Sequence, residues 1–202
     1  MVTVWGRVNS INVQKVMWAL AELGVPHRRI DAGMEFGVVT TPEYRRMNPN
    51  GLVPTVQDGD LVLWESNAIV RYLYAKYGPS RTPERQAVAD KWMDWTTSRV
   101  QPPMRTLFWG YVRTAPERRD TAALDAARTQ TAEVLAIADE ALASQPYVAG
   151  DECTMGDIPL GCFVNRWYQL PIERPARAHL AAWYERLQAR PGYREHVMVP
   201  LR

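Results

Sequence analysis

Three short segments in the first third of the chain combine side chains that can bind a charged or peptide-like ligand. The first is the turn Asn9-Ser10-Ile11-Asn12, which lies between an apolar extended run and a helical pattern. Ligands in open α/β sheets bind beyond the carboxyl ends of strands, and helix N-termini attract anions. Ser10 and Asn12 can therefore donate hydrogen bonds to a negatively charged atom. The alternative is a plain helix cap, since serine and asparagine are favoured capping residues.

The second segment is Val53-Pro54, at the start of a predicted strand. Proline is tolerated there because its missing N–H does not break a strand ladder. If the peptide bond is cis, the exposed backbone N–H and C=O of Val53 can pair with a peptide-like ligand, as in strand addition to a sheet. The alternative is a trans proline that only opens the strand.

The third segment is Glu65-Ser66, at the start of a predicted helix. The Ser66 hydroxyl and the free N–H groups of a helix start suit a ligand carboxylate, and Glu65 suits a ligand ammonium group. The alternative is that Ser66 is the helix N-cap and Glu65 an acidic neighbour.

Alternating strand and helix signals in residues 1–78 predict the elements that position these segments. Helical spacing and turn residues predict helices at 13–23, at 42–47 with Thr41 as N-cap, and after Ser66 with Ser66 as N-cap. Short apolar runs predict strands at 2–5, 27–31, 55–57 and 61–63. The order β-α-β-α-β-β-α predicts a mixed four-stranded sheet with helices packed on it. The first domain is thus α/β.

The remainder of the chain is predicted to be all-helical. Residues 79–83 form a linker, and residues 84–202 form the second domain, with helical periods at 84–110, 120–143, 155–169 and 177–189. Pro102-Pro103 should kink or interrupt the first helix. Thr154 and Asp157 have the spacing of a capping box, which indicates a role in folding rather than in catalysis.

Composition excludes several other classes of protein. The 202 residues are 47% hydrophobic and 23% charged, which is typical of a globular chain rather than a disordered one. The formal charge, 24 − 22 = +2, gives no electrostatic reason to expect nucleic acid or acidic membranes as partners. Two cysteines and three scattered histidines are too few for a disulfide framework or a histidine-based metal site, so we expect no metal. The lack of a signal peptide or long apolar stretch predicts a soluble cytoplasmic protein.

The three segments, taken together, match one family. The stretches 4–24, Pro49-Asn50-Gly51-Leu52-Val53-Pro54-Thr55 and Leu63-Trp64-Glu65-Ser66-Asn67-Ala68-Ile69 resemble the cytosolic glutathione S-transferases. The resemblance resumes at Tyr147-Val148-Ala149-Gly150, at 154–158 and at the closing 183–193, so it covers almost the whole chain.

This resemblance implies a thioredoxin-like N-terminal domain that binds glutathione, an all-helical C-terminal domain and a homodimer. It implies a cis Val53–Pro54 bond, with the backbone of Val53 on the cysteinyl part of glutathione and Glu65 and Ser66 on its γ-glutamyl end. Ser10 matches the serine that hydrogen-bonds the glutathione sulfur in the serine-type classes, and Asn12 is a rival donor. The glutathione-binding set implied is Ser10, Asn12, Asn50, Val53, Pro54, Glu65 and Ser66.

The implied reaction is attack of the glutathione thiolate on a small hydrophobic electrophile, a detoxification chemistry in which glutathione is the co-substrate. Met104, Phe108 and Trp167 are the candidates for the electrophile site, because they follow the proline kink or lie on the helix expected to face the first domain. Aromatic residues at helical spacing are more often core residues. The alternatives are a glutathione-dependent disulfide reductase or peroxidase, and a non-catalytic binding module of the same fold.

Overall fold

The computed structural model describes residues 1–202 and divides into two compact units. The first unit comprises residues 1–80 and 191–199, and the second comprises residues 81–190 and 200–202. The change of unit after Ser80 falls inside the predicted linker 79–83. The sequence predicted that residues 84–202 all belong to the second domain, but residues 191–199 pack with the first unit.

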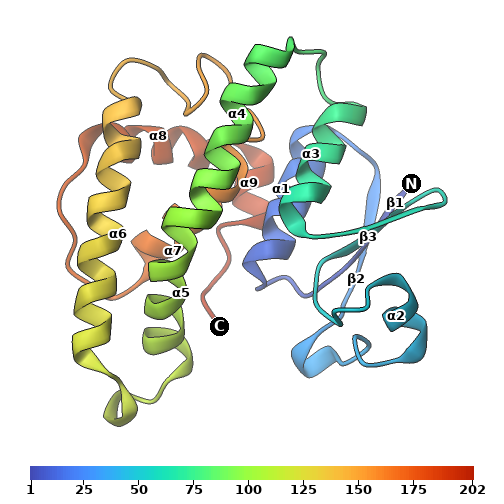
Figure 1. Cartoon of the computed structure of the whole chain (residues 1–202), viewed down its shortest axis with the longest axis horizontal. Helices are drawn as coiled ribbons and strands as arrows, with labels where there is room; N and C mark the ends of the chain where they lie inside the picture. The colour runs from blue at the N-terminus through green and yellow to red at the C-terminus, as the bar shows by residue number, and fades with distance from the viewer. The chain divides into compact units, whose positions relative to one another are not determined.

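The first unit contains a four-stranded mixed sheet with the strand order β2-β1-β3-β4, as the sequence predicted. β1 and β2 are parallel, and β3 is antiparallel to both β1 and β4. Figure 1 shows α1 and α3 on one side of the strands and α2 on the other. The elements are β1 (Val2–Trp5), α1 (Ile11–Glu22), β2 (His27–Ile30), a 3₁₀ turn (Met34–Phe36), α2 (Pro42–Met47), β3 (Thr55–Asp58), β4 (Leu61–Trp64) and α3 (Ser66–Tyr77).

Local capping signals explain where two of these helices begin. The Thr41 hydroxyl accepts a hydrogen bond from the N–H of Tyr44 at 3.2 Å, and Pro42 occupies the first position of α2, which confirms the predicted start. The prediction that Ser66 is the N-cap of α3 is wrong. Ser66 is the first residue of the helix, and Glu65 takes the cap position without a side-chain cap bond.

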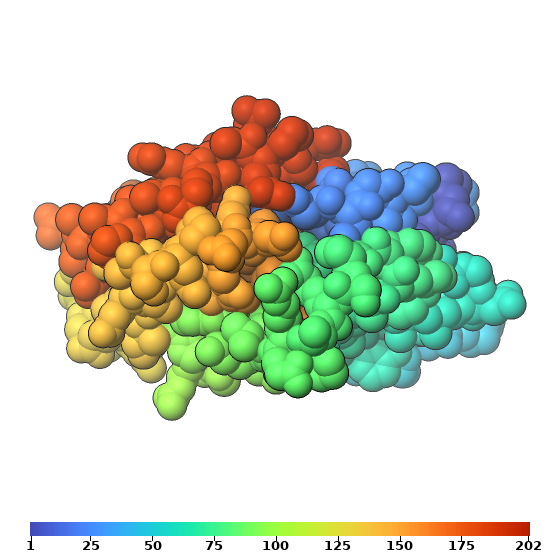
Figure 2. Space-filling view, turned by 90° about the horizontal axis from the view of Figure 1, so that it is seen from above, coloured from blue at the N-terminus to red at the C-terminus, as the bar shows by residue number.

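The C-terminal helix α9 (Pro191–His196) belongs to the first unit because it packs on α1. The rings of Trp18 and Tyr193 meet edge to face with centroids 4.7 Å apart, and both side chains are buried. A Cβ at Gly192 would lie 2.9 Å from the Cβ of Ala21, so glycine permits this close approach. Figure 2 shows the red C-terminal residues against the blue N-terminal segment.

The end of α9 carries a histidine whose titration should affect stability. The His196 side chain is only 14% exposed, and its ring centroid lies 6.1 Å from that of His27. Burial lowers the pKa of His196, with smaller contributions of the same sign from His27 and Arg29 and an opposing one from Glu195. The folded state therefore favours the neutral ring, and its stability should be complete above about pH 6.5 and fall as the pH drops below that value.

Replacing His196 with glutamine should flatten this pH dependence. The check is the urea midpoint of unfolding between about pH 5 and 8 for the wild type and for His196→Gln. His179→Gln, at an exposed histidine of α8, is the matched control. An equally steep decline in the His196 variant would contradict the assignment.

An acidic residue at the end of β3 holds α3 in place. The Asp58 carboxylate accepts hydrogen bonds from Tyr72, Lys76 and Tyr77 of α3 at 2.8, 2.7 and 2.6 Å. Burial alone would raise the pKa of Asp58, but these three donors lower it to about 2. The helix that presents Glu65 and Ser66 is thereby tied to the sheet.

The second unit is helical, as predicted. Its one β-type backbone pairing is an isolated antiparallel bridge between Tyr147 and Gly150. Its elements are α4 (Pro83–Trp95), a π-helical segment (Thr96–Val100), α5 (Gln101–Phe108), a second π-helical segment (Trp109–Arg113), a 3₁₀ turn (Pro116–Arg118), α6 (Thr121–Ala141), α7 (Asp157–Gln169) and α8 (Ala178–Gln188). None of the helices combines the length and the apolar character needed to cross a membrane.

The kink or interruption predicted at Pro102-Pro103 takes the form of a change in helix type, because the backbone stays right-handed helical from α4 into α5 and only the α-helical hydrogen-bond pattern is interrupted. The π-helical segment Thr96–Val100 ends directly before α5, and both prolines stand in the first turn of α5. The N–H of Gln101 still bonds to the C=O of Thr96 in the π-helical segment, and this wider turn accommodates the two following residues, which have no N–H to donate.

The start of α7 is built around Asp157, which is fully buried. Its carboxylate accepts from the N–H of Thr154, as in the predicted capping box, and also from the backbone of Val148 and the indole of Trp183. The Thr154 hydroxyl accepts from the N–H of Gly156 rather than from that of Asp157. The structural role predicted for this motif is therefore present, with more partners than the local pattern showed.

Candidate active site

The hydroxyl of Ser10 stands at the N-terminus of α1 without capping it. Ser10 is the N-cap residue by backbone geometry, and its C=O accepts from the N–H of Gln14 at 2.9 Å. Its side chain makes no cap hydrogen bond, although the residue is only 7% exposed. The plain-cap interpretation therefore fails for this hydroxyl, which remains available to a ligand at a helix terminus that favours anions.

Asn12 and Ser66 meet across the site although they are distant in sequence. The Ser66 hydroxyl donates to Oδ1 of Asn12 at 3.3 Å, and Nζ of Lys15 donates to the same oxygen at 3.2 Å. Because the Ser66 proton is used in this way, the hydroxyl presents acceptor lone pairs to a ligand. A carboxylate would then be bound by backbone N–H groups at the start of α3.

The loop before β3 carries the predicted cis peptide. The Val53–Pro54 bond is cis, as the family resemblance implied, and β3 begins at the next residue. The hydroxyl of Tyr44 donates to the C=O of Leu52 at 2.7 Å. The side-chain amide of Asn48 donates to the same oxygen at 2.9 Å. Both of these supporting side chains are buried.

Three segments of the first unit converge beside Val53. A Cβ added to Gly33 would lie 3.3 Å from a methyl group of Val53 and 3.2 Å from the guanidinium of Arg7. Arg7 belongs to the turn that leads to Ser10, since its C=O accepts from the Ser10 N–H. Asn50, which is exposed, is held by its hydrogen bonds to the side chain of Asn48.

Glu65 has a backbone conformation that is unusual for a residue with a side chain. Its φ is +71°, in the left-handed region, and its side chain is exposed while Ser66 is buried. Such a conformation costs about 1–3 kcal/mol and is found preferentially at ligand sites. Strain at Glu65 is thus a structural observation that agrees with the binding role predicted for this segment.

The three predicted electrophile-site residues all lie in the second unit. Met104 and Trp167 are buried, with 1% and 3% of their surface exposed, whereas Phe108 is half-buried. The guanidinium carbon of Arg166 lies 4.1 Å from the centroid of the Phe108 ring. Of the three candidates, Phe108 is the one that is not fully buried.

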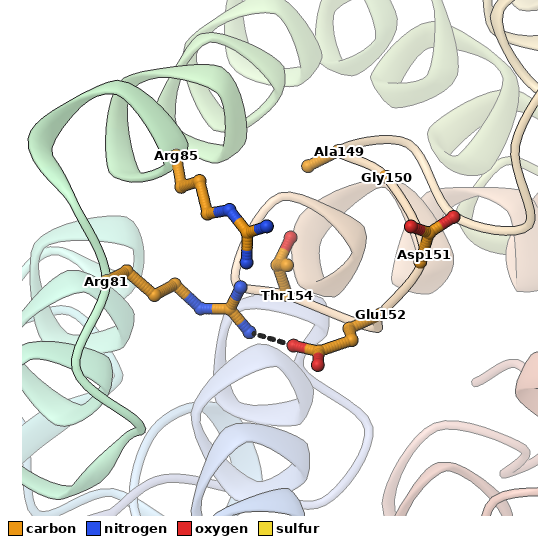
Figure 3. A pocket seen from close by; sticks show the side chains of 7 residues that line it. All are labelled: Arg81, Arg85, Ala149, Gly150, Asp151, Glu152 and Thr154. Atoms are coloured by element: carbon orange, nitrogen blue, oxygen red, sulfur yellow. Dashed lines mark hydrogen bonds and ion pairs between the residues drawn. The ribbon is translucent and has the colours of Figure 1, made fainter.

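The second unit also contains a polar cavity of about 200 Å³ between the start of α4 and the loop 149–154. Figure 3 shows Arg81 and Arg85 pointing toward this loop, with Arg81 paired to Glu152 at 2.9 Å. Two guanidinium and two carboxylate groups line the cavity, so their formal charges cancel. None of the predicted site residues belongs to its lining.

Three buried residues that hydrogen-bond to the site segments were not predicted from the sequence. Tyr44, Asn48 and Lys15 are buried polar side chains, and each makes hydrogen bonds that hold a predicted site segment. The dense turn signal at 48–51 marked the neighbourhood of Asn48. Nothing local distinguished Lys15 from an exposed helical lysine.

Comparisons with known proteins agree with this geometry. The family profiles described as "Glutathione S-transferase, N-terminal domain" and "Glutathione S-transferase, C-terminal domain" match residues 1–75 and 89–191. Glutathione S-transferase GstB of Escherichia coli K12 is 44% identical over 207 residues and covers 100% of both chains. Glutathione S-transferase 4 of Zea mays is 30% identical and covers 95% of this chain and 89% of the maize protein.

Solved structures give the same result. The theta class glutathione S-transferase from Xanthomonas axonopodis pv. citri, with glutathione bound, aligns with a TM-score of 0.95 at 54% identity, over 100% of this chain and 99% of that one. Its apo form aligns with a TM-score of 0.87. The sequence matches and the structural alignment span both units, and the chain therefore belongs to the glutathione S-transferase family.

Proposed function

We propose that this protein is a glutathione transferase that conjugates the glutathione thiolate to small hydrophobic electrophiles. The observation that carries the proposal is the buried Ser10 hydroxyl at the N-terminus of α1, which makes no cap bond. In the reaction the thiol proton goes to solvent and the sulfur bonds to the electrophilic carbon. The leaving group departs with its bonding electron pair.

The energetics of thiolate formation fit these groups. A free thiol with a pKa of about 8.5 is only a few per cent ionised near pH 7. Lowering that pKa by about two units takes about 2.7 kcal/mol of preferential thiolate stabilisation. A hydrogen bond to a charged group contributes about 1.5–3 kcal/mol, and a helix N-terminus about 0.3–1 kcal/mol. Ser10 and the N-terminus of α1 are together sufficient.

Acidification alone does not explain a large rate enhancement. The thiolate fraction rises roughly 25-fold, but a less basic thiolate is a weaker nucleophile. With a Brønsted slope of about 0.4–0.5, about 6- to 10-fold of the gain is lost again. Positioning of the electrophile must therefore contribute at least as much. We propose Phe108, with Met104 and Trp167, for that role.

Two measurements test the proposal. Retention on immobilised glutathione separates a glutathione-binding protein from a scaffold that only shares the fold. Turnover of an aryl halide with glutathione then tests conjugation, and a mixed disulfide tests the reductase alternative in parallel. Retention without turnover of any electrophile would refute the transferase assignment.

Glu65→Ala and Ser66→Ala should each raise the KM for glutathione while leaving kcat nearly unchanged. We propose that the Glu65 carboxylate and the lone pairs of the Ser66 hydroxyl hold the ammonium group of the γ-glutamyl end, which is remote from the sulfur. Loss of such uniform binding raises KM alone. Steady-state kinetics with glutathione as the varied substrate is the measurement. Glu133→Ala and Ser98→Ala, at exposed positions of the second unit, are matched controls. An unchanged KM in both site variants would refute the contact.

We also propose that the protein is a cytoplasmic homodimer. Leu52, Leu61 and Trp64 of the first unit are exposed by 65%, 40% and 40%, and burial of such side chains in a dimer would be favourable. Symmetric dimers are the commonest oligomers. Light scattering at micromolar concentration should give twice the chain mass of 23.0 kDa, and a value of 23.0 kDa would contradict the dimer.

A further inference from the structure

Lys15 is a buried lysine that takes part in the candidate glutathione site through another residue. It lies in the first turns of α1, and only 2% of its surface is exposed. Its Nζ donates to Oδ1 of Asn12 at 3.2 Å. Lysine is almost never fully buried without a partner, because desolvation of the ammonium group is costly. The ammonium group of Lys15 thus lies buried beside an asparagine of the proposed glutathione site.

The contact determines which end of the Asn12 amide faces Lys15. An ammonium group carries three donors and no acceptor, so the Asn12 atom beside it must be the oxygen. The same oxygen also accepts from the Ser66 hydroxyl at 3.3 Å. With Oδ1 held between two donors, the Nδ2 group is directed away from both. Asn12 can then act toward a ligand only as a hydrogen-bond donor.

We propose that Lys15 is a positioning residue that holds Asn12 with its amide N–H groups toward bound glutathione. This inference rests on the proposed function, because it concerns how that site presents a donor. Without Lys15, the Asn12 side chain can rotate by half a turn about its terminal bond and present Oδ1 to the ligand. An acceptor facing a thiolate or a carboxylate is repelled, so the correct orientation has to be enforced.

Charged groups on the elements that pack against α1 could also influence the bound thiolate, but none of them changes in the variants proposed below. Arg7 precedes α1, Glu65 and Arg71 lie at the start and in the middle of α3, and Glu195 and His196 lie on α9. A direct effect of the Lys15 charge on the thiolate would add to the contribution of Asn12. An effect that operates through the orientation of Asn12 requires Asn12 to be present. A double-mutant cycle separates the two.

The experiment measures the Kd of glutathione and the pKa of the bound thiol for the wild type, Lys15→Met, Asn12→Ala and the double variant. Lys15→Met should weaken glutathione binding about fivefold, the size expected for one hydrogen bond, and raise the pKa of the bound thiol by about half a unit. In the Asn12→Ala background, Lys15→Met should have no further effect. Lys91→Met, at an exposed lysine of α4, is the matched control.

Three results would overturn the proposal. The first is an unchanged Kd in Lys15→Met, and the second is a Lys15→Met effect that persists in full without Asn12. The third is glutathione binding by Asn12→Asp that is as tight as in the wild type. This variant also tests the proposal if Lys15→Met does not fold, because its carboxylate accepts from Lys15 and Ser66 but offers no donor to the ligand. A wild type that does not bind glutathione would instead refute the proposed function.

Discussion

Replacing Ser10 with alanine is expected to raise the pKa of the bound glutathione thiol by about one unit or more, at about 1.36 kcal/mol per unit. The variant loses the hydroxyl that stands at the N-terminus of α1 and makes no cap bond in the structure. Because that hydroxyl does not hold the helix, its removal should change the thiolate without destabilising α1. Conjugation near pH 7 should slow because less thiolate is present.

Asn12→Ala should shift the pKa of the bound thiol less than Ser10→Ala does. The oxygen of Asn12 already accepts from Lys15 and Ser66, so only its NH₂ group can contact a ligand, in a fixed direction. The Ser10 hydroxyl can instead rotate to point its proton at the sulfur. Titration of thiolate absorbance in the two binary complexes is the measurement, with Ser98→Ala as the control. A larger shift for Asn12→Ala would show that the assignment of Ser10 is wrong, and the disulfide-reductase alternative would gain weight.

Replacing Asp157 with alanine is expected to destabilise the second unit by about 3–5 kcal/mol. The carboxylate is fully buried and accepts from the backbone N–H groups of Val148 and Thr154 and from the indole of Trp183. Burial raises the pKa of Asp157, and the donated hydrogen bonds oppose that rise. Without the carboxylate, these buried donors lose their partner, and each unsatisfied group costs about 1–3 kcal/mol.

Asp157→Asn should be nearly as damaging although it keeps the shape of the side chain. Both carboxylate oxygens accept hydrogen bonds, so an amide NH₂ in place of either oxygen would face a donor. Urea denaturation followed by helical circular dichroism is the measurement, and Asp125→Ala on the exposed side of α6 is the control. Stability of Asp157→Asn within about 0.5 kcal/mol of the wild type would show that the bonds contribute little.

Elements whose signals lie within a few residues could be predicted from the sequence. The Thr41 cap with Pro42, the strands around Val4 and Val56 and the interruption before Pro102 depend on local backbone preferences, which a short window contains. Reliance on local preferences also explains why the prediction of Ser66 as an N-cap is wrong. Its residue type favours that position, but the left-handed backbone of Glu65 moves the helix start by one residue.

The order of the elements, the division into an α/β unit and an all-helical unit, and the segments that carry Ser10, Val53 and Glu65 could all be predicted from the amino-acid sequence. The contacts that those segments make became visible only in the folded chain. Asn12 and Ser66 are separated by 54 positions, and α9 joins the first unit through ring packing on Trp18. The burial of Lys15 is likewise a property of the folded chain. Such contacts depend on how distant surfaces fit together, and no local pattern of residue types encodes that fit.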